Sequence, residues 1–467
     1  MNKKTQKRTK TRRVHHNAGE SERKPGINTM MHPDSAGIDV GAEEFVVAVP
    51  FGRGGEASVR TFSAFTSGVE AVRDWLQESG IKTAAMESTG NYWITLYDTL
   101  VQAGIEVYLV NARHVKGVPG KKTDVCDAQW LQQLHAAGLL KKSFRPDQDI
   151  VPLRFLMRHR GELVGDASKQ LQLMQKSLTE MNLKIHHVFS DIDGVSAQAI
   201  IDAILRGERD ADQLAALRDK RCRSSLAEIK EALRGDYRAE YLFVLKQSQQ
   251  IWKQLLEAIM QCDQQIAEVS AKVTCTVNCP LPADPSRKRT VSKNSPQFAI
   301  LEEAWRFYGV DLSTAPGVGP RVLSALMSEV GTREHLLKSF RSGAALASWV
   351  GVCPDNRISG GKVLKAKTRK VACRLAEALR LAAFGLHRSE TKLGEYFRRM
   401  KARLGKAEGL VATAHKLARI LYGMIQSQRP YEEAEAFKIT PQTLARRRRN
   451  LEKQAAALGL QLQPIAA

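Results

Sequence analysis

The chain has 467 residues, and its 71 lysines and arginines against 49 acidic residues give a formal net charge of +22. That length allows two to four domains, and the positive excess makes a polyanion the expected partner. No apolar run approaches the roughly 20 residues of a membrane span, and the N-terminus lacks the apolar core of a signal peptide. We therefore expect a cytoplasmic protein without a membrane partner, and seven scattered cysteines fit a reducing compartment.

Residues 1–33 are expected to form a disordered basic arm. Nine lysines and arginines lie within residues 1–24, where Glu20 and Glu22 are the acidic residues and almost nothing is apolar. Such an arm can contact phosphates without reading sequence. A solubilising tail accounts for the same composition equally well.

Residues 34–148 read as an α/β domain. The apolar patterns predict three leading strands and then helices that alternate with strands. Such an order indicates a mixed sheet covered by helices. Two strands joined by a short turn are expected within residues 36–49, and further strands at 58–65, 83–86 and 106–110. The expected helices are 67–78, 92–103 and 124–137.

Four acidic residues occupy unusual positions in this domain. Asp39 lies within the first strand, Glu87 ends a later one, and Asp124 and Asp127 share one face at the start of a helix. Carboxylates held together repel one another unless a divalent cation with oxygen ligands joins them. We therefore hypothesise a metal site at one end of the sheet. The alternatives are embedded acids with structural partners and a first helical turn that complements the helix dipole.

Residues 149–279 are predicted to form a helical arm, because two apolar stripes step by three and four residues. We expect two long helices in an antiparallel coiled coil, interrupted by a polar helical region near residues 206–237. A basic linker rich in proline and serine follows at residues 280–297. The stripes are Leu171, Met174, Leu178, Met181, Ile185 and Val188, and Trp252, Leu255, Ile259, Cys262, Ile266 and Val269.

Two motifs stand out in residues 298–428. Gly317-Val318-Gly319, followed by Arg321, resembles a helix-hairpin-helix turn, which presents backbone N–H groups to a phosphate. Ser359 precedes two glycines, where backbone can approach a phosphodiester closely, although an ordinary turn serine is the simpler local interpretation. A run of basic residues without an acidic one follows this serine: Lys362, Lys365, Lys367, Arg369, Lys370 and Arg374.

The C-terminal residues 429–467 contain the run Arg446–Arg449. We expect a basic helical tail that contacts RNA or DNA backbone, and a solvated helix is the alternative.

In their order along the chain, these segments resemble the DEDD insertion-sequence transposases of the IS110/IS1111 group. The resemblance implies a RuvC/RNase H-like domain at residues 34–148 and a helical C-terminal transposase domain at residues 298–428. It further implies that Asp39, Glu87, Asp124 and Asp127 bind Mg²⁺, or Mn²⁺, and that Ser359 is catalytic. The segments that carry it are Gly37–Val40 with Phe45, Glu87–Tyr92, Val110–His114, Lys122–Ala128, Ala315–Gly319, Phe340–Gly343, Ala347–Gly351 and Ser359–Lys362.

The same resemblance implies element and target DNA as substrates and a guide RNA, of the bridge or seeker kind, from the element's noncoding end. Ser359 of one subunit would meet the acidic cluster of another, in a homodimer that pairs into a tetramer, and would link transiently to a DNA phosphate. The host would be bacterial and the protein nucleoid-associated when acting. Nucleic-acid contacts are expected at Lys122, Gly317, Gly319, Arg321, Lys362, Lys365, Lys367, Arg369 and Lys370.

Two other functions stay open at this point. A metal-dependent junction or structure-specific endonuclease would use the four acids with water, and Ser359 would then be structural. A non-catalytic nucleic-acid scaffold would need none of these residues for chemistry.

Overall fold

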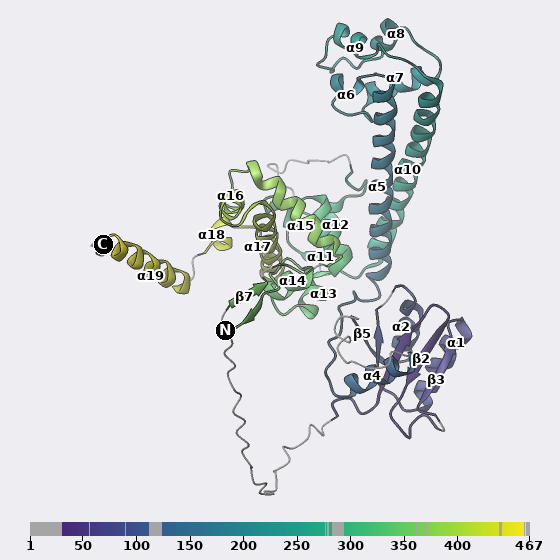
Figure 1. Ribbon diagram of the computed structural model, residues 1–467, viewed down its shortest axis with the longest axis vertical. Coiled ribbons are helices and arrows are strands. Elements are labelled where there is room, and N and C mark those ends of the chain that lie inside the picture. The colour runs from purple at the N-terminus through teal and green to yellow at the C-terminus, as the bar shows by residue number, and fades with distance from the viewer. Residues whose placement is uncertain are drawn as a thin grey trace, which may run out of the picture. The chain divides into compact units, whose positions relative to one another are not determined.

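The computed structural model of the protein divides into two compact units, residues 1–145 and residues 146–467, and each is described by itself (Figure 1). The predicted N-terminal arm up to residue 29 lies outside the described residues, as does most of the predicted linker. The described ranges are 30–55, 57–88, 90–111, 124–275, 277, 280–282, 294–360, 362–365, 367–369, 371–438, 441–461 and 463.

A five-stranded mixed sheet with the strand order β3-β2-β1-β4-β5 forms the centre of the first unit. The first three strands are antiparallel, and β4 and β5 run parallel to β1. This arrangement confirms the mixed sheet and is compatible with an RNase H-like domain. The strands are β1 (Ser35–Val40), β2 (Glu44–Ala48), β3 (Val59–Ser63), β4 (Thr83–Glu87) and β5 (Glu106–Val110).

Helices cover both faces of this sheet. Ile38 and Met86 belong to the apolar core under α1 (Thr66–Glu78) and α2 (Trp93–Gln102). Because successive strand residues point to opposite faces, Gly37 and Ala85 face the other side. There α4 (Asp124–Ala136) packs on the sheet through Ala128 and Leu131. Each of these three helices begins and ends within one residue of its predicted range.

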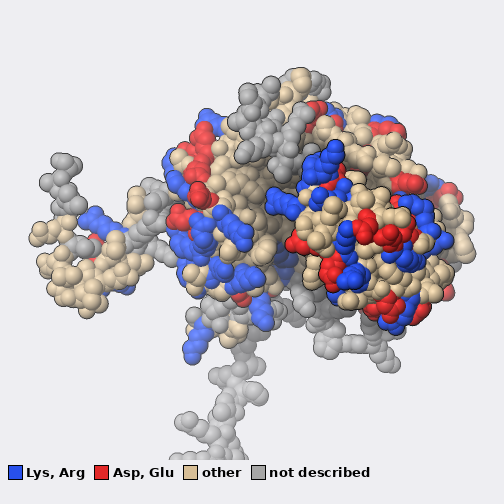
Figure 2. All heavy atoms as spheres, turned by 90° about the horizontal axis from the view of Figure 1, so that it is seen from above, with Lys and Arg blue, Asp and Glu red and all other residues tan. Residues whose placement is uncertain are grey.

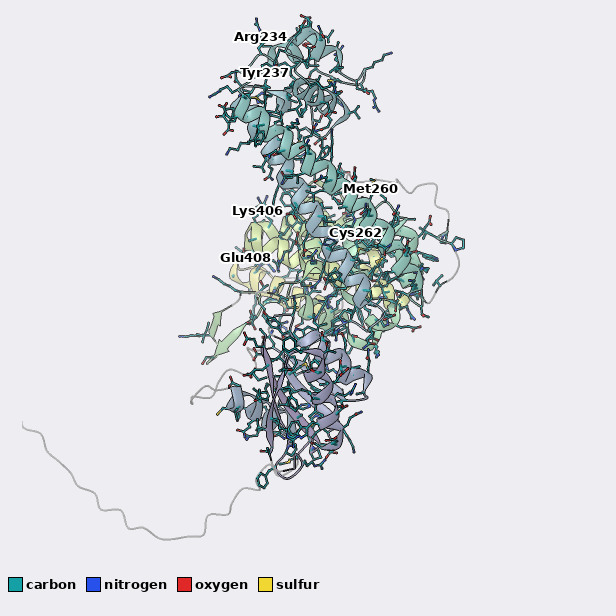
Figure 3. All side chains as sticks on the ribbon, turned by 90° about the vertical axis from the view of Figure 1, so that its right-hand side faces the viewer. Arg234, Tyr237, Met260, Cys262, Lys406 and Glu408 are labelled. Carbon is teal, nitrogen blue, oxygen red and sulfur yellow. The ribbon has the colours of Figure 1, made fainter. Side chains whose placement is uncertain are left out.

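Two long helices, α5 (Val151–Glu180) and α10 (Ala239–Lys272), run side by side in the second unit. They are antiparallel, since Arg160 near the start of α5 pairs with Asp263 near the end of α10. Figure 3 shows Met260 and Cys262 on α10, with Arg234 and Tyr237 at the far end of the pair. The far end holds α6 (Ile185–Val188), α7 (Val195–Leu205), α8 (Ala211–Ala216) and α9 (Leu226–Ala232).

The prediction that one helix carries the whole first stripe is wrong. The helix α5 ends at Glu180, and Asn182 adopts a left-handed backbone conformation with φ of 57°. Asparagine tolerates that conformation better than most residues, and it terminates the helix. Ile185 lies on the separate helix α6, where it packs into the core of the far end.

Helix α17 (Lys406–Ser427) contacts α14 (Gly343–Val350), α15 (Arg374–Gly385) and α16 (Lys392–Leu404). A two-stranded hairpin of β6 (Arg357–Ser359) and β7 (Lys362–Lys365) is inserted between α14 and α15. None of the helices in the described ranges is long and apolar enough to cross a membrane. The other elements are α11 (Ile300–Tyr308), η1 (Leu312–Thr314), α12 (Pro320–Val330), α13 (Arg333–Ser339), α14 (Gly343–Val350), α15 (Arg374–Gly385), η2 (Leu386–Arg388), α16 (Lys392–Leu404), α17 (Lys406–Ser427), α18 (Glu433–Ala436) and α19 (Pro441–Ala457).

Candidate functional site

Asp39 and Glu87 come together at the carboxyl ends of two neighbouring strands. The parallel strands β1 and β4 pair Ile38 with Met86, so the next residues, Asp39 and Glu87, lie at the same level. Ile38 and Met86 face the core under α1 and α2. Their successors therefore face α4, with neighbouring strands about 4.8 Å apart. Two partly buried carboxylates thus lie side by side on one face of the sheet.

The start of α4 is directed to the same end of the sheet. A Cβ on Gly37 would lie 2.2 Å from the carbonyl oxygen of Ala128, so this helix contacts β1 without any intervening side chain. The helix runs antiparallel to β1, because Gln132 Nε2 donates to the carbonyl of Ser35 at the opposite end of the strand. Its first residue, Asp124, precedes Ala128 by one turn and belongs to the same helical face.

The residue types at this end of the sheet suit a divalent cation, although the spacing of the described ones does not. Asp39, Glu87 and Asp127 carry carboxylate oxygens, the ligand type that Mg²⁺ and Mn²⁺ prefer. The backbone of Asp124 is described but its side chain is not, and Lys122 lies outside the described residues. Within what is described, no group of three or more histidines, cysteines or acidic residues is close enough to hold a metal ion.

His135, which is not among the residues predicted from the sequence, fixes the other end of α4. Its Nε2 lies 2.9 Å from Thr83 Oγ1, at the start of β4. Burial lowers the pKa of His135 to about 4, so the ring is neutral at pH 7. The available signal was its position eleven residues after Asp124, on the sheet-facing stripe of the helix.

Ser359 ends strand β6 in the second unit and is exposed. It pairs with Lys362 across a turn that begins at Gly360, whose φ of 54° is left-handed and favours glycine. Arg369 donates a hydrogen bond to the carbonyl of Ser348 on α14, which anchors the chain after the hairpin. A hydroxyl and an ammonium group therefore lie together at the exposed end of a ribbon.

The basic run after Ser359 does not form one patch. Lys362 and Lys367 are exposed near the hairpin, whereas Arg374 begins α15, pairs with Glu162 on α5 at 2.9 Å and donates to a carbonyl of α5. Lys370 and the side chain of Lys365 lie outside what the structure describes. Arg374 therefore lies against α5 and not with the hairpin, because the chain turns into a helix that contacts α5.

The two glycines of the hairpin-like motif differ in their surroundings. Gly317 has a left-handed φ of 84°, and a Cβ there would approach the carbonyl oxygen of Ala382 on α15 at 3.1 Å. Gly319 is the N-cap of α12 and has open space around it. Arg321 in the first turn of α12 is exposed, and one of its guanidinium nitrogens lies 3.8 Å from a carboxylate oxygen of Glu377. Contact between this motif and a phosphate stays a prediction.

Two family models match the chain over both regions. A transposase model of the IS110 DEDD type matches residues 36–183, which include the four acidic residues. A second model, described as transposase IS116/IS110/IS902 family, matches residues 311–398, which include Ser359. No individual curated protein matches the chain significantly. Transposases of this kind cleave and rejoin DNA, and the chain belongs to the IS110 family of DEDD transposases.

Proposed function

We propose that this transposase exchanges DNA strands through a transient covalent bond between Ser359 and a DNA phosphate, with a divalent cation and a guide RNA. The observation that supports the cation most directly is the pairing of Asp39 and Glu87 on one face of the sheet, with the start of α4 at the same end. Carboxylates from two strands and a helix are a donor set that a bare protein stabilises poorly.

Asp39, Glu87, Asp124 and Asp127 are the residues that would hold the cation. When bound, Mg²⁺ or Mn²⁺ would supply stabilisation of the negative charge that develops on the phosphate oxygens. The direct packing of α4 on Gly37 supports this assignment, because it fixes the helix relative to the strand that carries Asp39. Asp39 and Asp127 would thus be positioned by the packing of a strand and a helix rather than by a loop.

Ser359 is the proposed nucleophile. Its Oγ would form a new bond to phosphorus while the bond from phosphorus to a sugar oxygen breaks, and a sugar hydroxyl would reverse the exchange at rejoining. A serine hydroxyl needs activation for this step. The carboxylates belong to the first unit and Ser359 to the second. We propose that they meet between subunits of a dimer that pairs into a tetramer.

Guidance by RNA is the part of the proposal that rests on the family resemblance, and the charge of the chain supports it. On the face shown in Figure 2, basic and acidic side chains are interspersed rather than collected in one basic stripe. The net charge of +22 nevertheless favours a nucleic-acid partner. These charges match a protein that contacts the phosphate backbone, while base pairing between RNA and DNA recognises the sequence. Lys362, Lys367 and Arg321 are the described basic residues that we assign to backbone contacts.

The test uses DNA with the element's junction, the noncoding flank as RNA source, and Mg²⁺, and looks for a protein–DNA adduct that resists denaturant. We expect the adduct in the native protein and in Ser168→Ala, a control at an exposed serine on α5. We expect none in Ser359→Ala or Asp39→Asn. Omission of the RNA should abolish adduct formation at the target sequence.

Two outcomes would replace this mechanism. Cleaved DNA without adduct, unchanged in Ser359→Ala, would indicate a metal-dependent endonuclease that uses water. Strand cleavage and excision unchanged in Asp124→Ala, with no adduct in the native protein, would remove both proposed sites from the chemistry and leave a nucleic-acid scaffold.

A further inference from the structure

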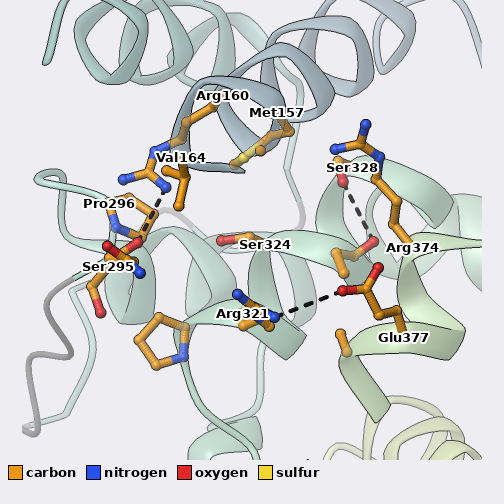
Figure 4. A pocket seen from close by; sticks show the side chains of 15 residues that line it. Met157, Arg160, Val164, Ser295, Pro296, Arg321, Ser324, Ser328, Arg374 and Glu377 are labelled. Carbon is orange, nitrogen blue, oxygen red and sulfur yellow. Dashed lines mark hydrogen bonds and ion pairs between the residues drawn. The ribbon is translucent and has the colours of Figure 1, made fainter. Parts of the chain in front are cut away.

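A pocket of about 480 Å³ opens in the second unit between α5, α12, α15 and residues 294–296 (Figure 4). That volume lies within the range of sites for small molecules and nucleotides. Part of its wall is apolar, through Met157 and Val164 of α5 and two prolines. Its charged lining is dominated by guanidinium groups: Arg160, Arg321 and Arg374 against Glu377.

Arg160 is a fixed part of the wall. It is buried, makes two hydrogen bonds to the carboxylate of Asp263, and donates to the carbonyl of Asn294 at the pocket edge. Breaking such a buried pair would leave an uncompensated charge. Arg160 therefore shapes the pocket and is not available to a ligand.

Arg321 is weakly paired, and Arg374 is held at the pocket wall. Arg321 and Glu377 are 3.8 Å apart, with 59% and 70% of their side chains exposed, and exposed pairs of this kind contribute roughly 0–1 kcal/mol. Arg374 pairs with Glu162, whose side chain is 66% exposed. The guanidinium of Arg321 can turn to a stronger acceptor at little cost. That of Arg374 is held by Glu162 and by the carbonyl oxygen of Arg158, so it stays in place at the pocket wall and offers its remaining N–H groups to a phosphate.

The first turns of α12 add further donors on the same side. Pro320 begins this helix, and Figure 4 shows Ser324, one turn later, between Arg321 and the α5 wall. The Ser324 hydroxyl oxygen is buried, and no hydrogen-bond partner for it is present among the described residues. A buried hydroxyl without a partner is costly, and an acceptor in the pocket would satisfy it. The positive end of the helix dipole favours an anionic acceptor there.

We infer that this pocket binds a phosphodiester of a single nucleic-acid strand. The phosphate lies between Arg321, Arg374 and Ser324, and the adjoining sugar or base lies against Met157 and Val164. The inference rests on the membership of this chain in a DNA-acting family and is independent of the Ser359 mechanism and of RNA guidance. It extends the single predicted contact at Arg321 to a built site with donors from two helices.

The experiment measures the affinity of the full-length protein for a short labelled single-stranded oligonucleotide by fluorescence anisotropy, in EDTA and over a salt series. EDTA removes divalent cations, so the assay measures binding alone and does not require DNA cleavage. Failure of the strand-exchange proposal would therefore not affect this result. Arg321→Gln should weaken binding roughly tenfold, the size of a lost charge-assisted hydrogen bond. It should also reduce the slope of log K against log salt by about 0.7, the value for one phosphate of a single strand.

Two further variants make the test specific. Glu377→Gln should tighten binding, because it frees Arg321 and removes the carboxylate from the pocket. Arg234→Gln is the matched control: Arg234 forms an exposed pair with Glu231 at 3.2 Å, at the far end of the long helices, and should leave the affinity unchanged.

A covalent trap adds a readout that does not depend on affinity. Ser324→Cys should form a disulfide, by thiol–disulfide exchange, with an oligonucleotide that carries a mixed disulfide on its backbone, with release of the small thiol and above the level of a Ser168→Cys control. Equal losses in Arg321→Gln and Arg234→Gln, or weaker binding in Glu377→Gln, would overturn the inference. The inference would also be overturned if inorganic phosphate binds in the pocket and the oligonucleotide does not. The pocket would then be a site for a free anion.

Discussion

Gly37→Ala tests whether α4 is placed by direct contact with the strand that carries Asp39. A Cβ at this position would lie 2.2 Å from the Ala128 carbonyl oxygen and 2.3 Å from the Gln132 backbone nitrogen. Ordinary contacts need more than 3 Å, so the helix must move away by about 1 Å. Both atoms belong to backbone and cannot rotate away. We expect a loss of about 3 kcal/mol, the upper part of the usual range for overpacking.

The same shift should reach the chemistry. A displacement of about 1 Å between catalytic groups can cost on the order of 100-fold in rate. We expect strand cleavage to fall by that factor under conditions in which the variant is still folded. Urea unfolding, monitored by hydrogen exchange of amides in the first unit, measures the free energy of unfolding. Cleavage of junction DNA with Mg²⁺ measures the rate.

Gly104→Ala is the control in the same unit. Gly104 has a left-handed φ of 81° and open space around it, so alanine there should cost about 1 kcal/mol from backbone strain without affecting cleavage. If Gly37→Ala is as stable and as active as the native protein, α4 does not lie against β1 and the assembly of the acidic site is wrong.

Three other changes test different parts of the structure. Glu329→Gln removes the charge from a buried carboxylate whose two oxygens accept hydrogen bonds from Arg158 at 3.0 and 2.9 Å. The free energy of unfolding of the second unit should fall by about 3–5 kcal/mol in thermal unfolding. A variant as stable as the native protein would contradict the buried pair. The pKa of His135 is about 4 when folded and 6.5 when unfolded, so stability is complete above pH 6.5 and should fall by about 3 kcal/mol as the pH drops to 4. His135→Gln should abolish this dependence in urea titrations, and an unchanged slope would assign it to other groups. Mg²⁺ at 100 times its Kd should stabilise the first unit by about 2.7 kcal/mol in the native protein and much less in Asp39→Asn, and equal shifts would place the cation elsewhere.

The sequence by itself determined the local elements and the candidate chemistry of this transposase. The helix that starts at Asp124 and the strand that ends at Glu87 follow from patterns of apolar residues, because hydrogen bonding within a helix and alternation along a strand are local. The four acidic residues could be singled out for the same reason, since unusual positions of charge are visible in short segments, whereas Ser359 was assigned a catalytic role only by the resemblance to the family.

Only the tertiary structure decided which of these elements meet. The register of β1 with β4 puts Asp39 level with Glu87, and the missing side chain at Gly37 lets α4 approach the strand. Glu329 accepts a hydrogen bond from Arg158, which is 171 residues away in the sequence. Arg374 lies apart from the hairpin and lines a pocket together with Arg321. Such contacts depend on how side chains from distant segments fit together, and the periodicity of a single segment carries no record of its partners.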